Sequence, residues 1–149
     1  MSDGGTLPPA GHHPPRPVPD RSTYGAPYWD AARAHRLVLQ RCTGCGRLQH
    51  FPRPWCTQCL ADDLEFVAAS GRGTIYSFTV VRRNRNPVFA PRTPYVIALV
   101  DLDEGVRVFT GIVDCDPDAV SVGQRVRVCF EDVDDDHSVP LFRLDPEGE

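Results

Sequence analysis

Two Cys-x-x-Cys pairs constrain the fold of this chain more than any other feature. Cys42 and Cys45 form the first pair, Cys56 and Cys59 form the second, and ten residues separate the pairs. Four thiolates at this spacing can converge on one tetrahedral metal ion, as in structural zinc sites. A lone pair would also suit thiol–disulfide chemistry, but a second pair so near favours a closed site with no position for water or substrate. We therefore predict one structural zinc ion per chain, bound by these four residues.

The segments beside the cysteines predict a zinc ribbon over residues 37–62. Residues 37–41 are apolar enough for a strand that ends at the first pair, and residues 48–51 suit the return strand. His50 lies between the pairs, but four cysteines already complete the metal's ligand shell, so we do not expect it to bind the ion.

A short helix is predicted before the ribbon. Pro27 suits a helix start, and the ten residues 28–37 are rich in good helix formers. So short a helix needs a neighbour for stability. Tyr28, Trp29 and Arg33 either pack this helix on the ribbon or contact a partner protein, because Trp and Tyr are favoured at binding hot spots.

Alternating and β-branched segments dominate the second half of the chain. Five such strands without intervening helices must protect their edges, and a small closed barrel does this best. We therefore predict a mainly β protein in which the zinc ribbon precedes an OB-fold barrel. The five strands are expected at residues 73–81, 95–102, 106–113, 125–130 and 140–144.

The remaining segments complete the predicted organisation. Many prolines and few apolar side chains in the first 23 residues predict a disordered arm. The chain shows no membrane-length apolar run and no secretory signal, so a cytosolic location is expected. Cys115 and Cys129 lie outside the cysteine pairs and are expected to be small packing residues. The predicted parts are an arm (1–23), the helix and ribbon (24–69), the barrel (70–145) and a tail (146–149).

Several motifs together resemble the zinc-ribbon/OB-fold family of acyl-CoA-associated proteins. The resemblance extends over about residues 27–145 and implies a rubredoxin-like zinc ribbon and a carboxy-terminal OB barrel. It is carried by Tyr28-Trp29, Arg36-Leu37, the cysteine pairs, and residues 70–77, 94–105 and 123–126.

Members of this family are accessory subunits of thiolase-superfamily enzymes. Their partners include aldolases of steroid side-chain degradation, acetyl-transferring enzymes, and archaeal assemblies of thiolase with hydroxymethylglutaryl-CoA synthase. Some relatives are fused to a MaoC-type hydratase domain, for which this chain is too short. The resemblance thus implies a stand-alone subunit that forms a hetero-oligomer with a thiolase-like enzyme.

Charge is distributed unevenly along the chain. Residues 31–100 carry ten Arg and three acidic side chains, whereas residues 101–149 carry four Arg and fourteen acidic ones. An anionic partner therefore suits the middle of the chain. A basic loop between the first two barrel strands is the candidate contact with CoA phosphates or with the partner, unless its arginines merely keep the barrel in solution. Its candidate residues are Arg82, Arg83, Arg85, Phe89 and Arg92.

The sequence contains no constellation expected of a catalytic site. None of the five histidines lies in a catalytic motif, and Cys115 and Cys129 lack a neighbouring base in the sequence. We therefore expect no catalytic residue and assign the chemistry to the partner.

Two other functions remain as alternatives. The first is a nucleic-acid-binding ribbon and barrel, which the net charge of -4 and the acidic end of the chain disfavour. The second is a rubredoxin-like electron carrier with iron on the same cysteines.

Overall fold

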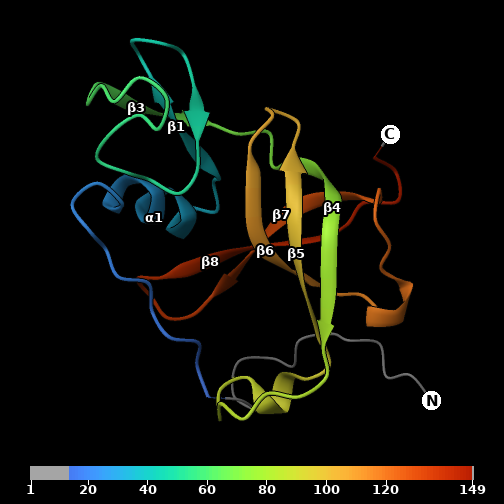
Figure 1. Cartoon of the computed structure of the whole chain (residues 1–149). Helices are drawn as coiled ribbons and strands as arrows, with labels where there is room; N and C mark the ends of the chain where they lie inside the picture. The colour runs from blue at the N-terminus through green and yellow to red at the C-terminus, as the bar shows by residue number, and fades with distance from the viewer. Residues whose placement is uncertain (1–13, 149) are drawn as a thin grey trace.

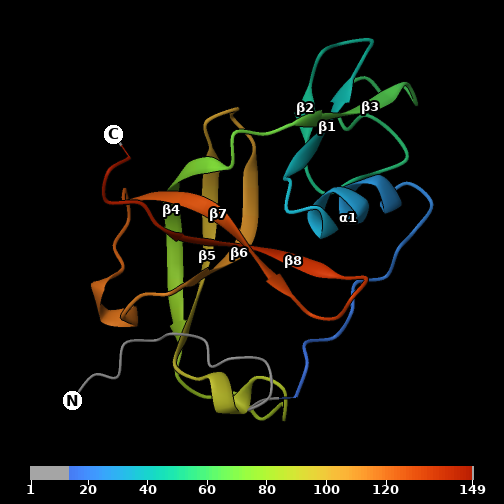
Figure 2. The same ribbon diagram turned by 180° about the vertical axis from the view of Figure 1, so that it is seen from behind.

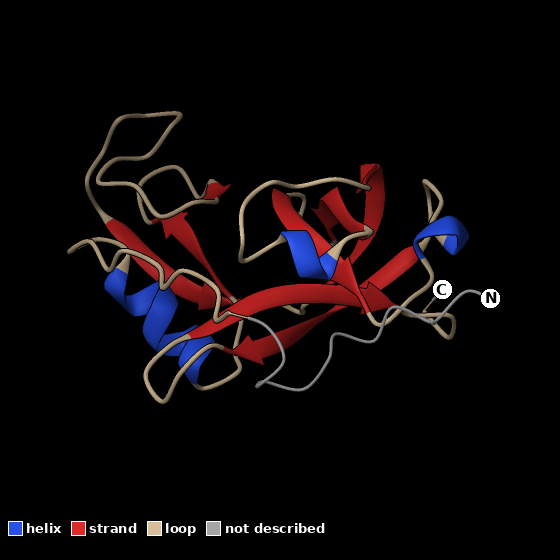
Figure 3. Ribbon diagram, turned by 90° about the horizontal axis from the view of Figure 1, so that it is seen from below, coloured by secondary structure: helices blue, strands red, loops and turns tan. Residues whose placement is uncertain are grey.

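The computed structural model describes residues 14–148 and shows a small ribbon module beside a larger barrel (Figure 1). Strands are the main regular elements of the molecule, and helix α1 (Ala26–Arg33) lies at one end of it (Figure 3). Buried residues of α1, the ribbon and the barrel form one continuous core cluster. Among the described residues, none of the helices has the length and apolar character needed to cross a membrane.

Helix α1 is shorter than the segment predicted from the sequence. Its first turn contains Pro27, and the backbone N–H of Ala26 donates to the carbonyl of Ser22 at 2.9 Å. His35 adopts a positive φ of 57°, which turns the chain out of the helix. The expected helix over residues 28–37 therefore ends four residues early, at Arg33.

The ribbon sheet has three strands in the order β2-β1-β3. These are β1 (Val38–Cys42), β2 (Leu48–Gln49) and β3 (Leu64–Ala68), and both pairings are antiparallel. Strand β3 was not among the strands predicted from the sequence. Residues 64–68 form a strand because their backbone pairs with β1 over its whole length, from Val38 opposite Ala68 to Cys42 opposite Leu64.

The predicted OB-fold barrel is confirmed as a closed five-stranded barrel in the order β4-β5-β6-β8-β7. Neighbouring strands are antiparallel except for the parallel pair β6 and β8. Along β5, every second residue is buried, as alternation across a barrel wall requires. The strands are β4 (Arg72–Val81), β5 (Tyr95–Leu102), β6 (Arg107–Val113), β7 (Arg125–Asp132) and β8 (Ser138–Leu144), with short helices η1 (Ala90–Arg92) and η2 (Pro117–Ala119) between them.

Side chains at the end of α1 and just after it fasten the ribbon module to the barrel. The ring of His35 stacks on Phe130 of β7 at 5.1 Å, and His35 Nε2 lies 2.7 Å from a carboxylate oxygen of Asp132. Arg33 also pairs with Asp136 in the β7–β8 turn. These contacts fix α1, and with it the ribbon, against the ends of β7 and β8.

The predicted disordered arm, residues 1–23, lies partly outside the described residues, which begin at Pro14. Residues 14–22 contain neither helix nor strand. They run from the loop that holds η1 to the start of α1 (Figure 2).

Gly71, at the start of the barrel, offers a test of this packing. It has a positive φ of 74°, and a Cβ placed there would lie 2.5 Å from Cγ1 of Val128. Gly105 has a φ of 86° but open space around the same position. We expect Gly71→Ala to lower the free energy of unfolding by about 3 kcal/mol, whereas Gly105→Ala should cost about 1 kcal/mol through its backbone alone. Urea unfolding followed by circular dichroism would measure both, and equal losses would contradict the close approach.

Candidate metal centre and neighbouring surfaces

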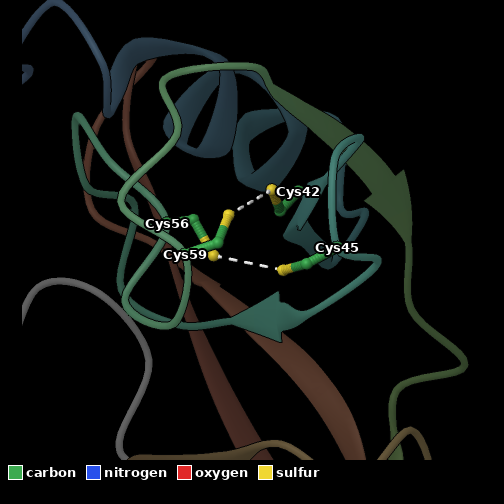
Figure 4. A group of neighbouring side chains, drawn as sticks. All are labelled: Cys42, Cys45, Cys56 and Cys59. Carbon is green, nitrogen blue, oxygen red and sulfur yellow. Dashed lines mark hydrogen bonds between the residues drawn. The ribbon is translucent and has the colours of Figure 1, made fainter.

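The four cysteine thiols converge at one end of the ribbon. Their Sγ atoms all lie within 4.8 Å of one another. Cys42 Sγ is 3.5 Å from Cys59 Sγ, and Cys45 Sγ is 3.5 Å from Cys56 Sγ (Figure 4). In a tetrahedral zinc–thiolate site with bonds of about 2.3 Å, the sulfurs lie about 3.8 Å apart. The thiols therefore fit a single tetrahedral metal ion.

Two similar turns position these thiols. In the first turn the N–H of Gly46 donates to the carbonyl of Cys42 at 2.8 Å, and Gly46 has a φ of 77°. In the second turn the N–H of Leu60 donates to the carbonyl of Cys56 at 3.1 Å, and Leu60 has a φ of 64°. Each turn thus reverses the chain around its own pair of sulfurs, with glycine at one reversal and a strained leucine at the other.

Backbone donors prepare one thiol for metal binding. Hydrogen bonds from the backbone of Cys59 and Gln58 lower the pKa of Cys56 to about 6. The N–H of Gln58 lies 3.4 Å from Cys56 Sγ. Because these donors favour the thiolate, they favour the form of the side chain that binds metal.

A buried pair of glutamines, which the sequence analysis missed, holds the segment that leads to the second turn. Gln49 Nε2 donates to Gln40 Oε1 at 2.8 Å and to the carbonyl of Trp55 at 3.0 Å. Gln49 Oε1 accepts from the N–H of Thr57 at 2.9 Å, and Gln40 bonds both backbone groups of Arg53. The pair therefore fixes the backbone on both sides of Cys56. The sequence signal that could have revealed this pair was the presence of one glutamine in each of the two predicted ribbon strands.

His50 lies outside the thiol cluster. Its ring packs 5.2 Å from Tyr28 and 4.1 Å from Phe51. Burial lowers its pKa to about 4, so the imidazole is neutral at physiological pH. Aromatic packing therefore holds the His50 ring, and that His50 does not bind the metal stays a prediction.

The helix residues proposed as partner contacts lie mostly inside the molecule. Tyr28 is 5% exposed, and burial raises the pKa of its hydroxyl. Its ring meets Trp29 edge-on at 4.9 Å, and Trp29 is itself partly buried against the core. Only Arg33 is exposed, and it pairs with Asp136. These positions favour the packing role for Tyr28 and Trp29.

An exposed apolar surface, which the sequence patterns did not predict, lies on the ribbon and on the turn before α1. We call Tyr24, Phe51, Trp55 and Leu60 the ribbon patch. Trp55 is 60% exposed and Leu60 is 75% exposed, and the four residues line a recess of about 420 Å³ together with Pro52 and Pro54. Large apolar side chains in turns, where polar residues are usual, were the signal that could have revealed this surface.

The structure divides the five residues predicted in the basic loop into two groups. Arg82, Arg83 and Arg85 are exposed and line a recess of about 370 Å³, which we call the basic recess. Arg82 also pairs with Asp118 at 3.0 Å. In contrast, the side chain of Arg92 is only 8% exposed and donates to Glu131 at 3.1 Å, while Phe89 packs near Tyr95 at 6.1 Å. Arg92 and Phe89 therefore belong to a different surface.

Two family models match the chain in succession. Residues 29–65 match the rubredoxin-like zinc ribbon domain of ChsH2, and residues 66–131 match its C-terminal OB-fold domain. The four clustered thiols lie within the first match. Thiol cluster and family model together indicate a metal-binding ribbon.

Three curated relatives are similar to the chain. It is 39% identical to a probable enoyl-CoA hydratase alpha subunit of Thermomonospora curvata, over 87% of the chain but only 39% of that protein. It is 37% identical to a DUF35 domain-containing scaffold protein of Methanothermobacter thermautotrophicus, over 66% of the chain and 74% of the relative. It is also 41% identical to the benzoylsuccinyl-CoA thiolase subunit BbsA of Geobacter metallireducens, over 46% of the chain and 44% of the relative.

A solved structure shows the same architecture. The chain is similar to a chain of the Ltp2-ChsH2(DUF35) aldolase with a TM-score of 0.75 and 38% sequence identity. The match covers 87% of this chain and 98% of that one. Ribbon, helix and barrel are therefore shared as a unit.

The glutamine pair predicts a measurable effect on metal affinity. Replacing Gln49 with Leu would leave the N–H of Thr57 and the carbonyl of Trp55 without their buried partners, which would loosen the approach to Cys56. We expect Gln49→Leu to weaken zinc affinity about tenfold in competition with a chelating dye. Gln58→Leu is the control, because its exposed side chain contacts only Arg47 among the hydrogen bonds of the described residues. Equal affinities of the two variants would contradict the positioning role of Gln49.

Proposed function

Because the chain belongs to the DUF35 family, in which a ChsH2-type zinc ribbon precedes an OB fold, we propose that it is a non-catalytic accessory subunit of an acyl-CoA enzyme. The proposed partner is a thiolase-superfamily enzyme, either an aldolase, a thiolase or an acyltransferase. Support comes from relatives named as a thiolase subunit, a hydratase alpha subunit and a component of an aldolase. The chain spans about two fifths of the length of the hydratase alpha subunit that it matches.

The ribbon patch is the observation that carries this proposal. Tyr24, Phe51, Trp55 and Leu60 present exposed apolar surface around one recess. An exposed apolar cluster on a small domain marks a protein interaction site, and aromatic residues such as Trp55 are favoured there. The patch therefore suits docking of a partner subunit.

Zinc is the proposed ion, held by Cys42, Cys45, Cys56 and Cys59. Bound zinc would supply folding energy to the ribbon, since structural zinc binds small modules with about 10–16 kcal/mol. The chain's own contribution is to hold the four thiols within 4.8 Å of one another and to display the ribbon patch on the adjoining turns. The metal is thus proposed to act through structure and not through chemistry on a substrate.

The basic recess is proposed to face the partner or the phosphates of its CoA substrate. Three arginines line it, and guanidinium groups form paired hydrogen bonds with phosphate oxygens. Asn84 holds the recess in shape, because its side-chain amide donates to the Tyr95 hydroxyl at 2.8 Å. A cytosolic location, where acyl-CoA enzymes find their substrates, stays a prediction.

Isolation of the tagged full-length chain from its native cells tests the accessory role. We expect a thiolase-like protein in stoichiometric amount, identified by mass spectrometry. The double variant Trp55→Ala/Leu60→Ser should recover at least tenfold less of it, because both changes remove exposed apolar contact area.

Val122→Ser is the matched control, since Val122 is also an exposed apolar residue but belongs to the barrel. All variants should keep the zinc content of the parent chain. Unchanged partner recovery with the double variant would contradict docking at the ribbon patch. Nucleic acid that stays bound at moderate salt would instead support the nucleic-acid alternative.

A second experiment tests the basic recess. The triple variant Arg82→Ala/Arg83→Ala/Arg85→Ala should weaken either binding of a CoA ester or formation of the complex about tenfold, more strongly at low salt. A control triple variant, Arg36→Ala/Arg72→Ala/Arg127→Ala, removes the same charge from exposed positions outside the basic recess and the ribbon patch. Titration calorimetry would measure both, and unchanged affinities for CoA ester and partner in the recess variant would refute the proposal.

A further inference from the structure

An apolar groove of about 340 Å³ is lined largely by barrel residues and shares no lining residue with the ribbon patch or the basic recess. Residues from β5, β6 and β8 line it, among them Phe109, Ile112 and Leu141, and Phe89 borders it from the loop that holds η1. Two arginines also line it, Arg92 from η1 and Arg16 from the segment before α1. A residue far from the barrel in sequence therefore forms part of the groove.

Arg16 is held at the groove by a carboxylate and an aromatic ring. Its guanidinium forms an ion pair with one oxygen of Glu131, whose other oxygen accepts from Arg92 at 3.1 Å. The guanidinium carbon also lies 5.8 Å from the centre of the Phe89 ring. The Arg16 side chain is 18% exposed and that of Arg92 is 8% exposed, so water screens these pairs less than ordinary surface pairs.

The same segment is fastened at two further points. Arg92 donates a second hydrogen bond to the carbonyl of Pro14 at 3.3 Å, and Arg21 forms an ion pair with Asp30 of α1. Residues 14–21 thus bridge the groove and the helix. Pro15, Pro17 and Pro19 restrict the backbone between these points, which lowers the entropy lost when the segment is held.

Little apolar burial holds this segment in place. Val18 is 52% exposed, and Pro14, Pro15 and Pro17 are also exposed. Its attachment therefore depends on charged contacts at its two ends, above all on Arg16. A segment held in this way can be released by the loss of one contact without unfolding the barrel.

We propose that Glu131, Phe89 and Arg92 form a guanidinium-binding site for Arg16, and that residues 14–21 are thereby held as a strap at the edge of the apolar groove. The strap is a conformational device: in the closed form the Arg16 side chain forms one wall of the groove, and release of Arg16 removes that wall and widens the groove. This inference concerns the free chain and does not depend on the identity of the proposed partner.

The test uses full-length chain loaded with zinc, together with the variant Arg16→Gln. Backbone amide relaxation measured by NMR should show Val18 restrained in the parent chain and mobile on the nanosecond scale in the variant. The uncharged apolar probe Nile red should bind the variant about three- to tenfold more tightly, because release of the strap widens the groove and the loss of the Arg16 charge does not affect a neutral probe. Amide shifts at Phe109 and Ile112 would locate the probe in the groove.

Arg36→Gln is the matched control, since it removes the same charge from an exposed position that does not line the groove. It should leave both the mobility of Val18 and the probe affinity at the values of the parent chain. Equal mobility of Val18 in parent and Arg16→Gln chains would overturn the strap. Equal probe affinity in those two chains, or probe-induced shifts at Trp55 and Leu60 instead of Phe109, would overturn its control of the groove.

Discussion

The convergence of four cysteine thiols is the constraint on which the ribbon depends. The module has one short helix and three short strands, and β2 contains only two residues. Such elements bury too little apolar surface to hold the two cysteine turns in place by themselves. A metal ion bound by Cys42, Cys45, Cys56 and Cys59 would join the turns at one point, while the glutamine pair fixes the backbone that connects them. Phe51 and Trp55 of the ribbon patch lie on this connecting segment and Leu60 lies in the second turn, so the shape of the patch depends on the metal site and its supporting hydrogen bonds.

The ribbon and the barrel also depend on each other. Residues of α1 and β1 share a buried cluster with the barrel strands, and the His35 ring lies flat on Phe130. This junction gives the apolar ribbon patch and the basic recess a fixed relation within one small molecule. A scaffold subunit requires surfaces held in this way more than it requires a catalytic pocket. The strap adds a third feature, because it ties the segment before α1 to β7 of the barrel through Arg16 and Glu131.

The sequence by itself determined the features that depend on local pattern. Cysteine spacing was enough to predict the convergence of the thiols, and period-two alternation was enough to predict the barrel strands, because both signals lie within a few neighbouring residues. The charge of the basic loop was also visible, and three of its arginines do line one recess. The family resemblance agreed with these patterns and added the expected partner class.

Only the tertiary structure decided which side chains pair across long stretches of chain. Residues 64–68 became a strand because β1 offered a free edge, and Tyr28 became a core residue because the ribbon folded over it. Arg92 was indistinguishable in sequence from Arg82, Arg83 and Arg85, yet it is buried against Glu131, 39 residues later. Gln40 and Gln49 meet across two strands, and Arg16 reaches a carboxylate 115 residues away. Such contacts depend on how strands register and pack, and no local pattern of residue types records that.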